Sequence, residues 1–255
     1  MGFSTLLGNE RLKENLTRSL KKGHIAHFYL ISGPEGSGKH TLAHLLSAAI
    51  LCEGTEPPCM TCHACRRVLE DIHPDVIWVE DKDKKTVTVD LMRQARADAF
   101  IRPNEAAYKI YVIPRAQDMR LEAQNALLKI LEEPPKHLLF ILTCENRSQL
   151  LPTIRSRTVC LPLTGVTEDQ AVTVLRERLP GRPEEELRRA ATVFGGVIGQ
   201  ALQGLEDDTF RQVTTLAPAI ARALTASDEL ELLRLTNKMT KDKETLTGVL
   251  TCLPL

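Results

Sequence analysis

The sequence has few aromatic residues and no net charge. Phe, Trp and Tyr make up 4% of its 255 residues, with a single Trp, and 33 Lys and Arg balance 33 Asp and Glu. A protein that binds nucleic acid alone usually carries a basic excess, and single-strand binders add aromatic side chains on which bases stack. We therefore expect any role on nucleic acid to be shared with partner proteins.

Long apolar runs are also missing. No stretch of the sequence has the length that a bilayer-spanning helix needs, and the N-terminus lacks a basic start followed by an apolar block. We therefore expect no membrane span, no secretory signal and a cytoplasmic location. In the reducing cytosol, clustered cysteines favour a bound metal over disulfides.

Short apolar runs alternate with helical patterns in the first two thirds of the chain. The runs are continuous, which is typical of strands buried on both faces of a parallel sheet. They fall at residues 27–32, 75–79, 108–113, 138–143 and 159–163. Helical patterns cover residues 9–22, with Asn9 as N-cap, and the stretches VDLMRQARADAF and RLEAQNALLKILEE. The alternation predicts an α/β domain with a parallel sheet over residues 1–164.

The pattern changes after this domain. Residues 165–206 carry no strand signal, and EDQAVTVLRERL, PEEELRRAATVF and GQALQGL predict three helices with glycine and proline turns between them. Residues 207–255 are also helical and amphipathic in pattern. We therefore expect two helical domains, 165–206 and 207–255, to follow the α/β domain.

A phosphate-binding loop follows the first predicted strand. Gly33-Pro34-Glu35-Gly36-Ser37-Gly38-Lys39 fits G-x-x-x-x-G-K between a strand and a helix. Gly33, Gly36 and Gly38 let backbone N–H groups surround phosphate oxygens, and Lys39 would reach the β- and γ-phosphates. A glycine-rich turn without a ligand is the alternative, but the flanking elements favour a nucleotide loop.

The residues that hold magnesium are incomplete in this loop. The residue after the lysine is usually Ser or Thr, which ligates Mg²⁺, but here it is His40. Thr41 follows, yet on a helix it points about 100° away. The loop could still hold phosphate, with Gly33, Gly36, Gly38, Lys39 and Thr41 as the residues of a degenerate nucleotide site, so ATP binding stays open, while a complete magnesium site is disfavoured.

The strand that should carry catalytic acids also lacks them. A working P-loop ATPase ends a second strand with Asp-Glu, where Asp holds Mg²⁺ and Glu polarises the attacking water. The matching strand, residues 109–113, is followed by Pro114 and Arg115, and Asp118 lies too far along to replace an acid simply. Pro114 has no ligand atom and Arg115 would repel the metal, so the sequence predicts loss of hydrolysis.

Four cysteines lie within a short segment after the loop helix. Cys52, Cys59, Cys62 and Cys65 form C-x6-C-x2-C-x2-C, separated by polar, turn-like residues. Four thiolates at this spacing suit a closed, tetrahedral, structural Zn²⁺ site. His63 and His73 are close in sequence, but four sulfurs already saturate the metal, and we interpret His63 as a surface residue. We interpret the isolated thiols as small buried hydrophobic residues: Cys144, Cys160 and Cys252.

Taken together, these motifs resemble bacterial DNA polymerase III clamp-loader subunits, the delta-prime and gamma/tau proteins of the AAA+ class. The resemblance spans roughly residues 1–205 and rests on four stretches: FYLISGPEGSGKHTLA, the cysteine insertion at 52–65, EAQNALLKILEEPP and LLPTIRSR. It implies an AAA+ α/β domain at 1–164, a helical lid at 165–206 and a short or truncated helical collar at 207–255. The implied partners are the gamma/tau and delta subunits and, through the assembly, the sliding clamp and primed DNA.

Within this family, delta-prime is the member that has lost its ATPase residues. The resemblance therefore points to a delta-prime-type subunit of the DNA-directed DNA polymerase holoenzyme without intrinsic ATPase activity, on the strength of Pro114 and Arg115. Gly199 agrees, because it stands where active relatives place a sensor arginine. Ser156-Arg157-Thr158 matches the family's Ser-Arg-Cys motif, which makes Arg157 an arginine finger for the neighbouring subunit's ATP site.

Two alternatives stay open beside this interpretation. One is an active gamma/tau-like ATPase that uses Asp118 or Glu145 as an unusual acid, which Lys39 favours. The other is a zinc-dependent nucleic-acid binder that acts alone, which the zero net charge disfavours. Arg155 is a rival for the finger role, and an extended segment would send the two arginine side chains to opposite sides.

Overall fold

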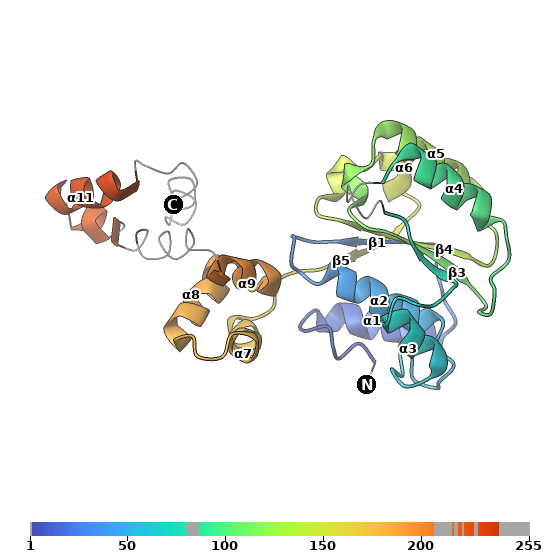
Figure 1. Ribbon diagram of the computed structural model, residues 1–255, viewed down its shortest axis with the longest axis horizontal. Coiled ribbons are helices and arrows are strands. Elements are labelled where there is room, and N and C mark those ends of the chain that lie inside the picture. The colour runs from blue at the N-terminus through green and yellow to red at the C-terminus, as the bar shows by residue number, and fades with distance from the viewer. Residues whose placement is uncertain are drawn as a thin grey trace. The chain divides into compact units, whose positions relative to one another are not determined.

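The chain forms two compact units, residues 1–164 and 165–255 (Figure 1). The computed structural model describes residues 2–80, 87–206, 216, 219–220, 222–226 and 229–239. The first unit is α/β, as predicted, and the described elements of the second are helices. None of the helices in these ranges combines the length and the apolar character that a membrane span requires.

A parallel five-stranded sheet is the centre of the first unit. Its strands are β1 (Phe28–Ser32), β2 (Val76–Trp78), β3 (Lys109–Ile113), β4 (Leu138–Cys144) and β5 (Val159–Pro162), in the order β2-β3-β4-β1-β5. All four strand pairs are parallel. Each predicted apolar run is therefore confirmed as a strand, within one or two residues at its ends.

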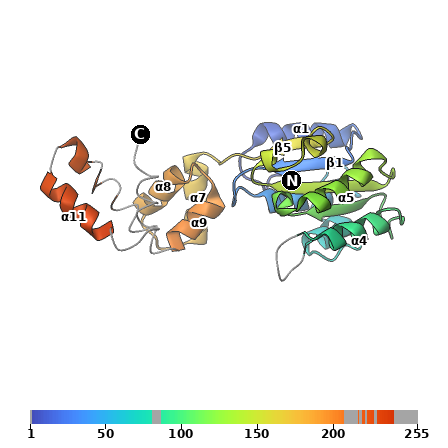
Figure 2. The same cartoon turned by 90° about the horizontal axis from the view of Figure 1, so that it is seen from above.

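Helices cover both faces of the sheet, which explains why the strand sequences are continuously apolar (Figures 1 and 2). The helices on one face are α1 (Glu10–Lys21), α2 (Lys39–Ile50) and α3 (His63–Leu69), and those on the other are α4 (Val89–Ala99), α5 (Leu121–Glu132) and α6 (Pro152–Arg155). Neighbouring residues of β1 serve opposite faces: Ile31 packs with α2, whereas Leu30 packs with α5. β3 and β4 are buried along their whole length.

The start of α1 corrects one detail of the prediction. Asn9 holds the N-cap position, but its φ of 54° is left-handed and its side chain does not cap the helix. Its side-chain oxygen instead accepts a hydrogen bond from the Thr164 backbone N–H at 3.1 Å, and its amide donates to the Thr164 carbonyl at 3.3 Å. Asn9 therefore fastens α1 to the segment that follows β5.

The second unit begins with a three-helix cluster. Its helices are α7 (Glu168–Arg178), α8 (Glu184–Val193) and α9 (Ile198–Glu206), which match the three predicted stretches. Thr167 and Gln170 form a reciprocal capping box at the start of α7. Gly196 lets the chain close on itself: its φ is 75°, and a Cβ there would lie 1.8 Å from the Val166 carbonyl oxygen. Small apolar side chains such as Ala190 and Ala201 fill the centre.

The remaining described part of the second unit includes α11 (Glu229–Met239). Ile220, Ala223 and Leu235 are buried together there.

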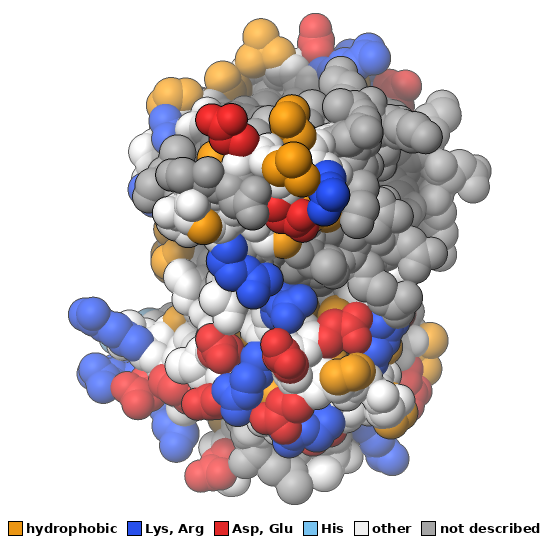
Figure 3. All heavy atoms as spheres, turned by 90° about the vertical axis from the view of Figure 1, so that its left-hand side faces the viewer, with side chains coloured by type: hydrophobic (Ala, Val, Ile, Leu, Met, Phe, Trp, Pro, Cys, Tyr) orange, Lys and Arg blue, Asp and Glu red, His pale blue; other side chains and the backbone are white. Residues whose placement is uncertain are grey.

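Acidic and basic side chains are interspersed in the lower part of the face shown in Figure 3. Some such side chains pair with each other, as Arg188 and Glu184 of α8 do at 3.1 Å. Cys252 lies outside the described residues, and the separate collar over 207–255 stays a prediction.

A buried carboxylate fixes β2 in place beside the phosphate loop. Asp75 is fully buried and accepts backbone hydrogen bonds from Asn104, Glu105 and Ala106 at 2.6–2.9 Å. Burial alone raises the pKa of Asp75, but these hydrogen bonds outweigh it and hold the pKa below its ordinary value. Because β2 carries Trp78, this network also positions the side chain that packs beside α2.

We expect Asp75→Asn to lower the free energy of unfolding by about 2–3 kcal/mol, because an amide NH₂ would face backbone N–H donors. The carboxylate's contribution is complete above its unfolded pKa, near 3.8, and is lost as pH falls through the lower folded pKa. Urea unfolding at pH 7 and at acidic pH measures both effects. Asp90→Asn, on the exposed start of α4, is the control and should change stability by less than about 0.5 kcal/mol.

Candidate nucleotide loop and metal centre

The glycine-rich loop joins β1 to α2, as the sequence predicts. Gly36 and Gly38 have φ values of 75° and 90°, which residues with side chains rarely adopt. A Cβ on Gly33 would lie 2.7 Å from the Leu163 carbonyl oxygen, so glycine is required there by close packing. Lys39 begins α2, and the first backbone N–H groups of that helix have no acceptor within it. The loop has the geometry of an anion site.

Lys39 is engaged with its own loop. Its ammonium donates hydrogen bonds to the carbonyl oxygens of Gly33 and Pro34, both at 2.8 Å. Partial burial lowers the pKa of Lys39, an effect that Glu145 opposes. The Ser37 hydroxyl oxygen is buried without a hydrogen-bond partner among the described residues. A phosphate group would have to draw Lys39 away from these two carbonyls.

His40 does not face the loop as a magnesium ligand would. Its ring stacks on Trp78, with centroids 4.3 Å apart and planes inclined by 23°. Thr41, the next residue of α2, is exposed. The structure thus gives the position after Lys39 a stacking partner on β2 in place of a hydroxyl.

The end of β3 lies at the same sheet edge, where acids would be needed. Arg115 has a φ of 49°, and its backbone N–H donates to the Thr143 hydroxyl at 3.1 Å. Its guanidinium contacts Asp118, with Nε 2.6 Å from Oδ2. Glu145 pairs instead with the Gln117 side chain. The two acids that could replace the missing pair are therefore already bonded to neighbours.

Gln124 connects α5 to the segment after β4, which the sequence analysis did not predict. It is buried on α5, donates to the Met119 carbonyl at 3.1 Å, and accepts from the Leu151 backbone N–H at 2.9 Å. It thereby fastens the segment 150–157 to α5. In the sequence, a polar Gln124 on the apolar side of this helical pattern could have indicated a buried hydrogen bond.

The structure distinguishes the two candidate arginines. Arg157 is exposed just before β5, and its Nη1 donates to the Thr153 carbonyl at 3.1 Å. Arg155 is half-buried and ends helix α6, with its Nε buried and unpaired among the described residues. Residues 152–155 form a helical turn, so the extended arrangement, which would send the two side chains to opposite sides, does not apply here. Arg157 is the arginine free to extend into solvent.

The four cysteines meet in one cluster. The sulfur atoms of Cys52, Cys59, Cys62 and Cys65 all lie within 4.8 Å of one another. A tetrahedral Zn²⁺ with bonds of about 2.3 Å has sulfur–sulfur edges of about 3.8 Å, which this arrangement can reach with small shifts. Backbone N–H groups point at the sulfurs, from Gly54 to Cys52, from Cys62 to Cys59 and from Cys65 to Cys62, at 3.3–3.4 Å.

The thiols differ in how readily they lose protons. Hydrogen bonds from Thr61 and Cys62 lower the pKa of Cys59 to about 6, whereas burial raises the pKa of Cys65 and of Cys52. A bound cation would stabilise all four thiolates together. The cluster can therefore hold a metal such as zinc, and no fourth ligand is missing for a closed site.

The other candidate residues are not part of the four-sulfur group. His63 is exposed, as predicted, and His73 is buried beside Glu105, with Nε2 3.5 Å from Oε1. Cys144 is buried and Cys160 half-buried, which agrees with small apolar roles.

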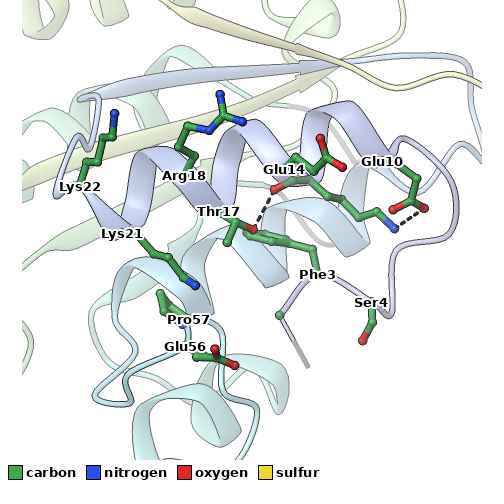
Figure 4. A pocket seen from close by; sticks show the side chains of 12 residues that line it. Phe3, Ser4, Glu10, Glu14, Thr17, Arg18, Lys21, Lys22, Glu56 and Pro57 are labelled. Carbon is green, nitrogen blue, oxygen red and sulfur yellow. Dashed lines mark hydrogen bonds and ion pairs between the residues drawn. The ribbon is translucent and has the colours of Figure 1, made fainter.

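A hollow of about 680 Å³ lies between the N-terminal segment, α1 and the turn of the cysteine-bearing segment that carries Pro57 (Figure 4).

Comparison with known proteins identifies the family. Residues 8–167 match the family described as DNA polymerase III, delta subunit. The chain belongs to this family. The matched range spans the phosphate loop, the cysteine cluster and the segment that carries Arg157.

Curated relatives carry two subunit names. The gamma/tau subunit of DNA polymerase III from Mycobacterium tuberculosis is 37% identical over 158 residues, which cover 61% of this chain and 27% of that protein. The delta′ subunit from Pseudomonas aeruginosa is 34% identical over 186 residues, which cover 70% of this chain and 56% of that protein. The matched region therefore spans less than two thirds of either relative.

A solved structure shares the fold of this chain. A mutant of RuvB from Thermotoga maritima superposes with a TM-score of 0.54 at 14% identity, covering 96% of this chain and 74% of that protein. At this identity the likeness concerns the fold alone. It agrees with the parallel α/β arrangement of the first unit.

We expect the purified chain to carry one Zn²⁺ in the cysteine cluster, and Cys62→Ser to lower the zinc content by at least about half an equivalent, because three sulfurs leave the tetrahedral site open. Serine preserves the N-cap position that Cys62 holds on α3, so loss of metal is separated from loss of a cap. Elemental analysis after purification without chelator measures this. Cys160→Ser, on β5, is the control, and equal zinc loss in both variants would contradict the assignment.

Proposed function

We propose that this chain is a delta-prime-type subunit of a bacterial DNA polymerase III clamp loader. In this role it hydrolyses no ATP itself, assembles with gamma/tau and delta subunits, and helps to load the sliding clamp on primed DNA. The observation that carries the proposal is the end of β3, where Pro114 and Arg115 replace two acids and Arg115 holds Asp118 at 2.6 Å.

Hydrolysis needs a held Mg²⁺ and a positioned water. An arginine in place of the metal-binding acid would repel a divalent cation, and its ion pair engages Asp118, one of the two acids that could replace the missing pair. His40 adds to the loss, because its ring stacks on Trp78 and leaves no hydroxyl after Lys39. These features support an AAA+ module that has kept the loop backbone but not the catalytic groups.

Arg157 is the residue proposed to act on the chemistry of a neighbour. In phosphoryl transfer, negative charge develops on the transferred group, and an arginine supplied from another subunit can neutralise it. Arg157 is exposed and its neighbourhood is fixed, because Gln124 binds the Leu151 backbone at the start of the same segment. A planar, permanently charged guanidinium suits this task better than lysine.

Two further assignments complete the proposal. The cysteine cluster would serve as a structural zinc site that folds residues 52–65 against α2, since Cys65 is buried and contacts the Ala48 carbonyl at 3.5 Å. Residues 165–206 would form the lid and 207–255 a short collar that joins the ring. Nucleotide binding through Gly33, Gly36, Gly38, Lys39 and Thr41 stays open in this scheme.

An active gamma/tau-like ATPase is the second candidate. The intact lysine of the loop and the similarity to the Mycobacterium tuberculosis gamma/tau subunit favour it. It would require Asp118 or Glu145 to leave its present partner and hold Mg²⁺. A steady-state ATPase measurement on the isolated chain separates the two candidates.

We expect the isolated chain to show no ATPase activity above background, and Lys39→Ala in this chain to leave the activity of an assembled loader unchanged. The reason is that neither magnesium nor water is positioned at its own loop. Coupled-enzyme turnover, with and without gamma/tau and delta, measures both. Turnover within tenfold of an active gamma/tau subunit, abolished by Lys39→Ala, would favour the second candidate.

In the assembled loader, with clamp and primed DNA, we expect Arg157→Ala to reduce ATP turnover and clamp loading. A finger contributes on the order of 10³- to 10⁵-fold at one site, but other sites in the same ring reduce the observed loss. Arg157→Lys should restore little, because lysine lacks the planar fork. Arg147→Ala, on an exposed turn, is the control; ring assembly by gel filtration must be normal in every variant, and unchanged activity in Arg157→Ala would refute the role.

A further inference from the structure

Two histidines and the single tryptophan form a cluster beside the phosphate loop. The rings of His40 and His44 lie with centroids 4.6 Å apart on successive turns of α2, and both pack on Trp78, at 4.3 and 4.7 Å. The proposed clamp-loader role makes no use of His44, and the cysteine cluster includes none of these residues. The contact of these three rings therefore has no role in either of the sites described above.

The hydrogen bonds of His44 leave one ring nitrogen facing a carboxylate. Its Nδ1 lies 3.3 Å from the Val68 carbonyl oxygen, which can only accept, so Nδ1 must carry the proton. In the neutral ring Nε2 is then a lone-pair acceptor, yet it lies 3.6 Å from Oδ1 of Asp71. Two acceptors at this separation attract each other only when a positive charge lies between them, either the proton of a charged imidazole, which makes an ordinary ion pair, or a metal ion.

The same arrangement is common among metal ligands. A histidine that coordinates through Nε2 usually donates Nδ1–H to a backbone carbonyl, which fixes the tautomer and the ring orientation. His40 stands four residues before His44, a spacing that puts two imidazoles on one helix face and serves zinc in helical metal sites. Asp71 contributes an exposed carboxylate, 57% of whose side chain is accessible. Two histidines and one carboxylate form a ligand set for divalent transition metals.

We propose that His40, His44 and Asp71 form a second metal site, separate from the four cysteines, which takes a divalent transition-metal ion such as Zn²⁺ or Ni²⁺. His44 and Asp71 already face each other. His40 completes the site by turning its exposed ring from Trp78 towards them, a side-chain rotation that leaves the helix unchanged. This site therefore forms fully only when the ion binds, whereas the four cysteine sulfurs already lie within 4.8 Å of one another.

A bound ion would join α2 to the turn after α3. Asp71 lies in that turn with a φ of 57°, and its backbone N–H donates to the Val68 carbonyl at 3.2 Å, the same oxygen that His44 contacts. Metal at this point would stabilise the cysteine-bearing insertion against the helix that follows the phosphate loop. It would also place a positive charge close to the residue that replaces the magnesium-binding hydroxyl.

Equilibrium dialysis against Zn²⁺ tests the proposal as a difference between variants of the full chain. We expect the wild-type chain to bind one equivalent more than His40→Ala or Asp71→Asn, whether or not the cysteine cluster is filled. Asn tolerates the left-handed backbone of residue 71, and His40 is exposed, so both variants should fold. The matched control is His24→Ala, an exposed histidine outside the cluster, which should bind as the wild type does.

The single tryptophan provides an independent reading. Ni²⁺ held by His40 and His44 lies next to Trp78, so its addition should quench the protein's tryptophan fluorescence, and His40→Ala or Asp71→Asn should weaken the apparent affinity by at least about tenfold. Co²⁺ absorption distinguishes the sites, because exchange into the cysteine cluster produces sulfur charge-transfer bands. Equal Zn²⁺ binding by all four proteins, or a loss in His24→Ala as large as in the others, would overturn the proposal.

Discussion

Parallel pairing of β1, β3 and β4 is the constraint on which the candidate site depends. Parallel strands end at the same edge of a sheet, and the register places Ser32 opposite Cys144 and Ile113 opposite Leu142. The phosphate loop, the Pro114–Arg115 turn and Glu145 are thereby brought together from distant parts of the sequence. Helices on both faces keep this edge fixed, because the apolar side chains of each strand are shared between two cores.

At this edge, one half of the site is preserved and the other half is replaced. The loop keeps the backbone geometry that binds anions, including a glycine that packs against Leu163. The positions that would hold magnesium carry other residues: Arg115 pairs with Asp118, and His40 stacks on Trp78. This combination is what the proposed function requires: a subunit that keeps the phosphate loop and leaves ATP hydrolysis to a neighbour.

The cysteine insertion depends on the same helix. Cys65 is buried against α2, where it contacts the Ala48 carbonyl. One turn earlier on the same helix, His44 contacts Asp71 in the turn after α3. Both connections add polar or metal-binding groups where the small insertion has few apolar residues to bury. A metal held by the four cysteines would compensate for a small core, because metal binding contributes directly to folding.

Local pattern in the sequence was enough for much of this structure. Continuous apolar runs gave all five strands, and glycine spacing and cysteine spacing gave the loop and the cluster, because each depends on residues close together in the chain. Contacts between distant residues were beyond such patterns. The Asn9 bond to Thr164, the hydrogen bonds from residues 104–106 to Asp75, the Gln124 bond to Leu151 and the His44–Asp71 pair each join residues at least 27 positions apart in the chain, which only tertiary folding brings together. The burial of Arg155 Nε, beside the exposed Arg157, likewise depends on how the folded chain packs around the helical turn at 152–155.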